Sequence, residues 1–337
     1  MKKIISLLSA AAIAACGFIG CTKPEGEQKT FHVYMPDGAP AVALGKFMSE
    51  GYDGAEFTVV PNAAKVTIAQ HVAKGDADMA ILPINAAATL YNSGVDIVMA
   101  SVNTHGNLYV IGEGDEITLS DLVGKKLGVI GQANVPEHAL KMLLEKYEIN
   151  YAEHETPTAE ENKVSITYVG NGAQLGPQLN GGLIDYGFLA EPAATTLCTN
   201  LKKNIVLDVQ AAWKEAFGGE FPQACLVVKK SLTKSNAKYV DRFIAALYGA
   251  DGWAEEHPSE VVEAVSTHME DGTATTLTTL TADTVKRCNI KTVPAVNAKS
   301  SCETYFNMLI EMSTALGAPI SKVPDDGFYY NPVDGLD

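Results

Sequence analysis

The chain has 337 residues and a formal net charge of −15. This acidic balance argues against a protein that binds nucleic acid or adsorbs on anionic lipid, because both activities need an excess of positive charge. About 310 residues remain after the N-terminal segment described next, which is enough for two domains of ordinary size.

We expect the first residues to be a targeting segment. Lys2 and Lys3 precede an apolar run over residues 4–15, which is too short to span a membrane. Cys16 and Cys21 each follow small residues, as in the lipobox at which bacterial lipoproteins are cleaved and lipidated. We therefore expect a protein of the cell envelope, lipid-anchored on the extracytoplasmic face of the membrane.

We favour Cys21 as the lipidated residue, because the polar stretch 22–28 that follows it suits a tether. Cys16 is the alternative, since its own lipobox is the better match. A third interpretation is a cleaved secretory peptide with incidental cysteines. The predicted segments are a signal peptide over residues 1–20 and a tether over residues 21–30.

The other four cysteines are scattered. Cys198, Cys225, Cys288 and Cys302 form no Cys-x-x-Cys pair and have no nearby histidine cluster. This pattern argues against a metal site, and we predict neither a metal nor a cofactor. Buried thiols are expected, with one disulfide as the alternative in an oxidising compartment.

Short runs of β-branched and aromatic residues predict strands. They cover residues 31–35, 57–60, 79–82, 97–100, 108–111, 127–130, 165–169, 186–189 and 224–228. Apolar spacing near 3.6 predicts helices between many of them, over residues 41–48, 64–74, 136–147 and 173–180. This alternation is typical of an α/β protein with parallel sheets. From about residue 236 the pattern changes to helices, including 240–256, 259–269 and 298–316.

An internal repeat predicts two similar lobes. Residues 72–82 and 179–189 each read as a helix end, a glycine turn, an aspartate and a buried strand. One constant offset aligns Gly75 with Gly182 and Asp78 with Asp185. The glycine suits a left-handed helix cap, and the aspartate can accept hydrogen bonds from turn amides.

Ligands of open α/β sheets bind beyond the carboxyl ends of the strands, where helix N-termini offer free amides. Two facing lobes would enclose a cleft lined by the loops at these ends. The loops are rich in Asn, Gln and Gly, which suit a network of neutral hydrogen bonds. The candidate ligand-binding residues are Asp37, Gly38, Ala39, Asn62, Asn85, Asn103, His105, Asn107, Gln132, Asn134, Asn171, Gly172 and Glu191.

These loops contain no arginine, because Arg242 and Arg287 both fall in the helical C-terminal part. Bidentate recognition of a carboxylate, sulfonate or phosphate is therefore not expected unless Arg287 reaches back. Asp37 and Glu191 could accept N–H groups from an amine or heterocycle, and the alternative for each is a helix cap. His105 is either a ligand contact or a hinge histidine with partners of its own.

Enzyme signatures are weak. The run from Gly170 to Gly176 misses the dinucleotide fingerprint by one residue in its last spacing, and we interpret it as a loop whose amides face a ligand. The sequence has no Gly-x-Ser-x-Gly elbow and no Gly-Lys-[Ser/Thr] phosphate loop. Residues 153–155 are interpreted as a solvated polar connection. We therefore expect a binding protein and not an enzyme.

The chain resembles the nitrate/sulfonate/thiamine-precursor binding proteins of ABC transporters. The resemblance is carried by residues 36–40, 75–78, 81–83, 107–110, 124–129 and 191–193. It implies the type II periplasmic-binding-protein fold, in which two similar α/β lobes are joined by crossing strands and the C-terminal helices lie on the first lobe. The first lobe would comprise residues 31–103 and 229–337, and the second lobe residues 109–222.

The resemblance also implies a function. The lobes would close on a small molecule, and the protein, expected to be a monomer, would deliver it to an ABC permease in the membrane. The loop chemistry favours a pyrimidine-like heterocycle. The alternatives are a sulfonate- or nitrate-type anion and a small-molecule enzyme on the same fold, although the cysteine-rich motif of the related yeast pyrimidine synthase is missing from this sequence.

Overall fold

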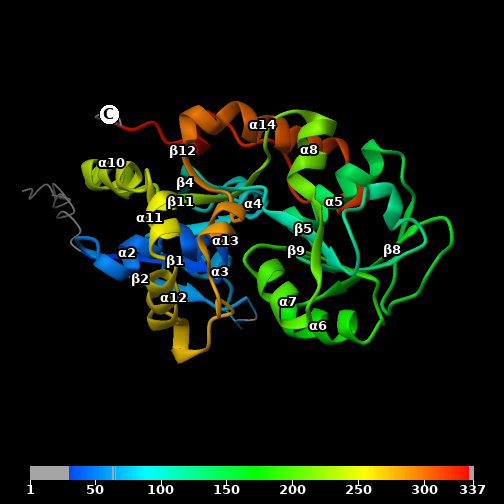
Figure 1. Ribbon diagram of the computed structural model, residues 1–337. Helices are drawn as coiled ribbons and strands as arrows, with labels where there is room; N and C mark the ends of the chain where they lie inside the picture. Colours follow the sequence, from blue (N-terminus) through cyan, green and yellow to red (C-terminus); the bar gives the residue numbers. More distant parts are fainter. Residues whose placement is uncertain (1–29, 63, 65, 334–337) are drawn as a thin grey trace, which may run out of the picture.

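The structure is a computed structural model that describes residues 30–62, 64 and 66–333. The predicted signal peptide, Cys16, Cys21 and most of the predicted tether lie outside these residues. Two six-stranded sheets lie side by side (Figure 1). We call the first sheet with its helices the first lobe, and the second sheet with its helices the second lobe.

The first lobe is built on a sheet of order β12-β4-β11-β3-β1-β2. Its strands are β1 (Phe31–Pro36), β2 (Ala55–Val60), β3 (Met79–Pro83), β4 (Ile97–His105), β11 (Pro222–Lys229) and β12 (Ile290–Pro294). β1 pairs in parallel with both β2 and β3, whereas β11 and β12 are antiparallel to β4. The carboxyl ends of β1, β2 and β3 therefore meet at one edge of the sheet.

The second lobe is built on a sheet of order β10-β5-β9-β6-β8-β7. Its strands are β5 (Leu108–Gly112), β6 (Lys126–Ile130), β7 (Tyr151–Glu153), β8 (Val164–Val169), β9 (Tyr186–Ala190) and β10 (Asn204–Asp208). β6 to β9 run parallel, and β5 is antiparallel to β9 and β10. In the second lobe, as in the first, the carboxyl ends of the parallel strands therefore meet at one edge of the sheet.

Helices cover both sheets. Those of the first lobe are α1 (Ala39–Ala43), α2 (Gly45–Glu50), α3 (Ile68–Lys74), α4 (Ile84–Asn92), α9 (Leu232–Ser235), α10 (Ala237–Ala246), α11 (Ala250–Glu256), α12 (Pro258–Thr267) and α13 (Ala282–Arg287), with the short helices η2 (Glu270–Gly272) and η3 (Asp326–Phe328). Those of the second lobe are η1 (Leu119–Leu122), α5 (Val135–Lys146), α6 (Gly172–Asn180), α7 (Ala193–Leu201) and α8 (Val209–Phe217). Of the helices described, none is both long and apolar enough to cross a membrane.

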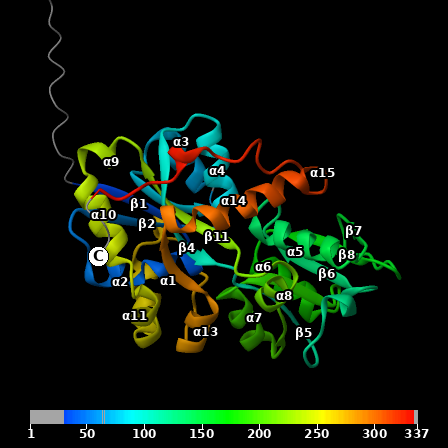
Figure 2. The ribbon, with the colours of Figure 1, turned by 90° about the horizontal axis from the view of Figure 1, so that it is seen from above.

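The last two helices, α14 (Ala295–Glu311) and α15 (Ser313–Leu316), run from the first lobe over the second (Figure 2). We call them the strap. α15 contacts α5, and the ring of Tyr305 in α14 lies 6.3 Å from that of Trp213 in α8. The C-terminal helices therefore join the two lobes as well as extending the first.

The predicted repeat is present in both lobes. Gly75 and Gly182 both have positive φ, at 82° and 70°. Asp78 Oδ2 accepts the amide of His32 at 3.0 Å, and Asp185 Oδ2 accepts the amide of Lys126 at 2.8 Å. Each aspartate thus ties its turn to the neighbouring parallel strand.

All nine predicted strands form, but the C-terminal part is not purely helical. β12 lies within it and adds an edge strand beside β4. The predicted helix 240–256 is two helices, because the chain turns at Gly249, where φ is 75°. The predicted helix 41–48 is likewise interrupted at Leu44.

One cluster of buried apolar side chains continues from the first lobe into the second. Its members include Leu82, Leu108, Leu127, Phe188 and Tyr305. Removing this apolar surface from water stabilises the association of the lobes. Within the described residues the four cysteines are free thiols, three of them buried and Cys198 half-buried.

Candidate functional site

The lobes touch at a seam formed by loops that follow strands. Asn85, in the first turn of α4, donates from Nδ2 to the carbonyl oxygen of Ala133 in the second lobe at 3.3 Å. Asn85 is 5% exposed, and its Oδ1 has no hydrogen-bond partner among the described residues. A buried acceptor left unpaired costs about 1–3 kcal/mol. Asn85 Oδ1 is therefore a seam group that an N–H or O–H of a solute would satisfy.

Asp37 follows β1 and is bonded to the loop between η2 and α13. Its Oδ1 accepts the hydroxyl of Thr275, and its Oδ2 accepts the amide and the hydroxyl of Thr276, each at 2.7 Å. Asn62, which follows β2, donates to the Asp37 carbonyl oxygen at 3.2 Å. Asp37 is 5% exposed and does not cap α1, because the N-cap is Gly38 and the structure shows no side-chain cap there.

Gly38 and Ala39 belong to the backbone at the start of α1. Gly38 has a φ of 132°, in the region that favours glycine. Ala39 is buried as the first residue of the helix. Both lie beside Asp37, so the structure brings these three predicted residues and Asn62 together.

Glu191 follows β9 and is bonded across the seam. Its Oε2 accepts the amide of Thr195 at 2.9 Å, and its Oε1 accepts the Thr195 hydroxyl at 2.5 Å. Arg287, at the end of α13 in the first lobe, places Nε 2.7 Å from Glu191 Oε1 and Nη2 2.8 Å from Thr195 Oγ1. Arg287 thus does reach back to the predicted cleft. The Glu191 side chain is fully buried, whereas that of Arg287 is 35% exposed.

Asn103 and Asn107 lie where the chain passes between the lobes. Asn103 Oδ1 accepts the amide of Leu226 at 3.0 Å. Asn107 accepts from Gln223 Nε2 at 2.7 Å and donates to the Cys288 carbonyl oxygen at 3.1 Å. Both asparagines are 1% exposed. Their bonds join β4 and β5 to β11, so both side chains hold the connection between the lobes.

His105 lies in the same connection. Its Nε2 is 3.2 Å from the carbonyl oxygen of Lys291, and its Nδ1 is 3.8 Å from Glu220 Oε2. The side chain is 12% exposed. Burial lowers the pKa of His105, and the Glu220 carboxylate opposes that shift. His105 has the partners expected of a hinge histidine.

The remaining predicted residues lie at helix N-termini of the second lobe. Asn171 caps α6 by accepting the Gln174 amide at 3.1 Å, and Gly172 is the first residue of that helix. Asn134 donates to the Gln132 carbonyl oxygen at 3.3 Å at the start of α5. The side chain of Gln132 is exposed.

Four residues that bond the Asp37 and Glu191 carboxylates are missing from the sequence-based set: Arg287, Thr195, Thr275 and Thr276. Arg287 lies 96 positions from Glu191, and Thr275 lies 238 from Asp37, so no local pattern links them. Thr195 stands four residues after Glu191, which is the spacing of neighbours on one helix face. That spacing is the one sequence signal that could have revealed part of the Glu191 site.

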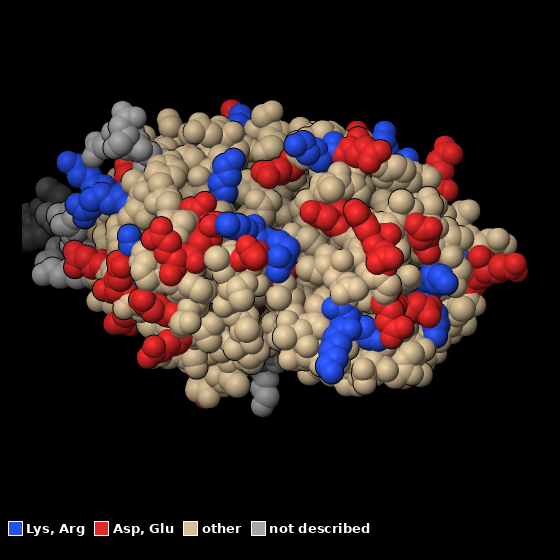
Figure 3. Space-filling model, viewed as in Figure 1, with Lys and Arg blue, Asp and Glu red and all other residues tan. Residues whose placement is uncertain are grey.

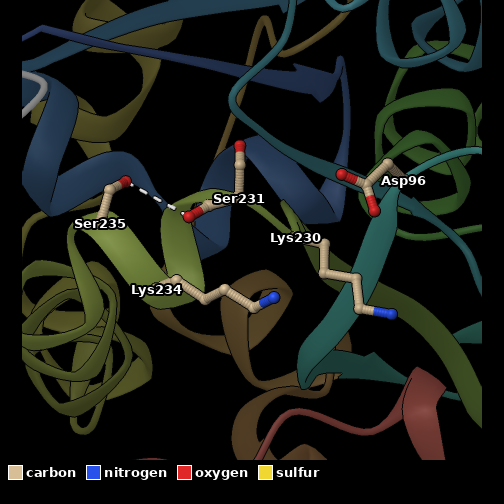
Figure 4. Close-up of a pocket in the computed structure, with 5 residues that line it drawn as sticks. All are labelled: Asp96, Lys230, Ser231, Lys234 and Ser235. Atoms are coloured by element: carbon tan, nitrogen blue, oxygen red, sulfur yellow. Dashed lines mark hydrogen bonds between the residues drawn. The ribbon is translucent and has the colours of Figure 1, made fainter. Parts of the chain in front are cut away.

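Two surface hollows lie away from the seam. One, of about 480 Å³, is lined by Asp96, Lys230, Ser231, Lys234 and Ser235 (Figure 4). All five of these residues are partly or wholly exposed. The other, of about 160 Å³, is lined by Gly106 of the connection between the lobes and by residues of α8 that include Trp213. Because neither contains a sequence-predicted site residue, the candidate site is defined by the seam contacts.

Acidic side chains are spread over both lobes, in keeping with the net charge of −15 (Figure 3). Basic side chains gather at the boundary between the lobes beside α13, which carries Lys286 and Arg287. Within the part of the chain that the structure describes, no group of three or more His, Cys, Asp or Glu side chains could hold a metal ion.

Comparison with solved structures shows a shared fold. An ABC transporter protein of Parabacteroides distasonis is 20% identical, with a TM-score of 0.70 over 90% of this chain and 99% of that one. The periplasmic aliphatic sulphonate-binding protein SsuA of Escherichia coli is 14% identical, with a TM-score of 0.63 over 90% and 93%. The ligand-binding component of an ABC-type import system of Staphylococcus aureus is 13% identical, with a TM-score of 0.61 over 90% and 97%.

A search of curated proteins finds no match. The family described as NMT1/THI5 like matches residues 41–261, more than half of the chain. The two similar lobes, the crossing strands and the solved neighbours agree with the periplasmic-binding-protein fold. The chain belongs to the NMT1/THI5-like family.

Proposed function

We propose that this protein is the solute-binding component of an ABC importer and that it captures a small molecule at the seam between its lobes. The family and the neighbours described as ligand-binding or sulphonate-binding proteins support this role. The observation that carries the proposal is Asn85, a buried side chain at the seam whose Oδ1 lacks a partner among the described residues.

Capture would proceed by closure of the lobes. Asn85 already bonds Ala133 across the seam, and amides at the starts of α4, α5 and α6 add donors there. Lipidation at Cys21 would hold the protein on the extracytoplasmic face of the membrane, where an ABC permease would receive the solute. No covalent step is needed for this function, and we propose no catalysis.

The proposed ligand is a neutral or weakly cationic heterocycle, such as a pyrimidine, which Asn side chains and backbone amides can orient. Arg287 supports a second candidate, a small monoanion. Its guanidinium is partly exposed at the seam while Glu191 and Thr195 engage Nε and Nη2. Guanidinium groups bind carboxylate and sulfonate oxygens well.

A thermal-shift screen with pyrimidines and with alkanesulfonates tests the proposal. A true ligand at one hundred times its Kd should add about 2.7 kcal/mol to the free energy of unfolding. Asn85→Ala should weaken that ligand by roughly tenfold. Asn204→Ala, at an exposed Asn of β10, is the control and should leave the affinity unchanged. Equal affinity in Asn85→Ala, or turnover of the ligand, would contradict the proposed role.

The two ligand candidates predict different effects of Arg287→Met on affinity. A monoanion should bind at least tenfold more weakly, because its charged partner is lost. A neutral heterocycle should bind within about threefold of the wild type. Isothermal titration with the best pyrimidine and the best sulfonate from the screen separates the two outcomes.

A further inference from the structure

A charged pair lies inside the second lobe. Glu137 and Lys141, one turn apart on α5, are 6% and 4% exposed, with Lys141 Nζ 2.6 Å from Glu137 Oε1. Glu153 of β7 brings a second carboxylate oxygen to 2.5 Å from Nζ. Residues 153–155 are thus not merely a solvated connection. Burying charges is costly, so a pair in this position needs every one of its hydrogen bonds.

The third donor of Lys141 goes to the strap. Nζ donates to the carbonyl oxygen of Ala315 in α15 at 3.2 Å. An ammonium group has three donors, and those of Lys141 are taken by Glu137, Glu153 and Ala315. Two of these acceptors belong to the second lobe and one to the strap. Lys141 therefore fastens the strap to the second lobe.

The other oxygen of Glu137 holds the loop at the seam. Glu137 Oε2 accepts the amide of Ala133 at 2.5 Å. Ala133 has a φ of 58°, a left-handed conformation that costs a non-glycine residue about 1–3 kcal/mol and persists only where its surroundings enforce it. The carbonyl oxygen of this same residue accepts the Asn85 bond. Glu137 thus supplies the contact that keeps Ala133 in place.

We propose that Glu137 and Lys141 are positioning residues for the seam: Lys141 fastens the strap, and Glu137 holds Ala133 where it meets Asn85. The bonds run without a gap from Ala315 through Lys141, Glu137 and Ala133 to Asn85. The inference rests on the proposed function only in assigning residues 131–134 to the solute site. The arrangement of the loop can be measured with no solute present.

Hydrogen–deuterium exchange of the full chain, combined with the fluorescence of Trp213 in a Trp253→Phe background, tests the proposal. Glu137→Gln should speed exchange at the Ala133 amide at least tenfold but leave Trp213, which faces Tyr305 of the strap, unchanged. Lys141→Met should alter Trp213 emission, because the bond to Ala315 is lost. It should also speed Ala133 exchange, because the Glu137 carboxylate loses the ammonium group that holds it in place. Lys163→Met, in an exposed ion pair of the same lobe, is the control and should change neither signal.

The double variant Glu137→Met with Lys141→Leu covers the case in which Lys141→Met fails to fold. It removes both buried charges together, which leaves no unpaired charge from the pair and is often neutral for stability. We expect it to remain folded, with faster Ala133 exchange and altered Trp213 emission. If Ala133 exchange is unchanged in both the double variant and Glu137→Gln, or Trp213 emission is unchanged in the double variant, the positioning role is overturned. Failure of the solute screen alone would contradict the proposed function and not this inference.

Discussion

The carboxylates at the seam are held by two different kinds of partner. Glu191 is paired with a guanidinium from the other lobe, whereas Asp37 is surrounded by hydroxyls and an amide of its own lobe. The strength of a hydrogen bond from an uncharged donor depends little on the salt concentration. The strength of an ion pair depends on it more, unless the pair is buried. The Glu191 carboxylate is buried although Arg287 is 35% exposed, so this pair should be screened by salt less than a surface ion pair.

His138, next to the charged pair on α5, should make stability depend on pH. It is fully buried, both ring nitrogens lack a partner among the described residues, and burial lowers its pKa to about 4. The unfolded chain takes up the proton first as the pH falls, because its histidine titrates near 6.5. The His138 contribution is therefore present above about pH 6.5 and is lost progressively toward pH 4.

Between pH 7 and pH 5 this loss should be on the order of 2 kcal/mol in the free energy of unfolding. Urea titrations at several pH values give the slope. In His138→Leu the loss in the free energy of unfolding between pH 7 and pH 5 should be smaller by about 2 kcal/mol, since the titrating group is gone. An identical slope in the wild type and the variant would show that the buried ring is not the cause.

At the scale of elements, the aspartates of the two repeat copies each accept a hydrogen bond from a backbone amide, but in different surroundings. Asp78 is 6% exposed, whereas Asp185 is exposed. Asp78→Ala would leave the His32 amide without its carboxylate partner, and we expect a loss of about 1–3 kcal/mol. Asp185→Ala is the matched variant and should cost less than about 1 kcal/mol, because water can replace the lost oxygen. Guanidinium denaturation compares them, and equal losses would contradict the dependence on burial.

Most of the strands that sequence reasoning found share one property. All except β2, which forms an edge of the first sheet, lie inside a sheet, and β3 and β11 are examples of their buried apolar runs. The missed strands β7, β10 and β12 lie at sheet edges, and each carries polar residues that resemble a loop. Their strand conformation depends on a partner that lies elsewhere in the sequence, which a local pattern does not contain.

The site was predictable to a similar extent. The rule that ligands gather at carboxyl ends of parallel strands led to Asp37, Asn85 and Glu191, which do lie at such ends. Asn103 and Asn107 are predicted from the same polar loop composition. Their side chains instead hold the connection between the lobes, because the chain crosses there. Composition alone does not separate a loop that faces a solute from one that carries the crossing.

For the whole molecule, the ion pair between Glu191 and Arg287 should contribute to the association of the lobes. A double-mutant cycle with Glu191→Gln and Arg287→Met should give a coupling energy of about 1–3 kcal/mol in urea unfolding. The Thr195 bonds remain in the Arg287 variant, so part of the Glu191 interaction survives there. Strict additivity of the two single variants would show that the pair does not couple the lobes.

The connection between the lobes should be sensitive to added volume at Gly106. A Cβ atom there would stand 2.3 Å from a ring carbon of Phe221, which is 1% exposed. We expect Gly106→Ala to lower the free energy of unfolding by about 1–3 kcal/mol. Gly252→Ala is the control, because a Cβ in that helix meets open space and should stabilise by up to about 1 kcal/mol. Similar effects of the two variants would contradict the packing described at the connection.

The order of the strands has a consequence for synthesis. The second sheet is made from one continuous stretch, β5 to β10, and can form as soon as that stretch exists. In the first sheet β4 lies between β11 and β12, and β11 lies between β3 and β4. The first sheet is therefore incomplete until residue 294 has been made, because β11 and β12, the neighbours of β4, both follow the second lobe in the chain. A growing chain of this design should therefore keep β4 without its two neighbouring strands until late in translation.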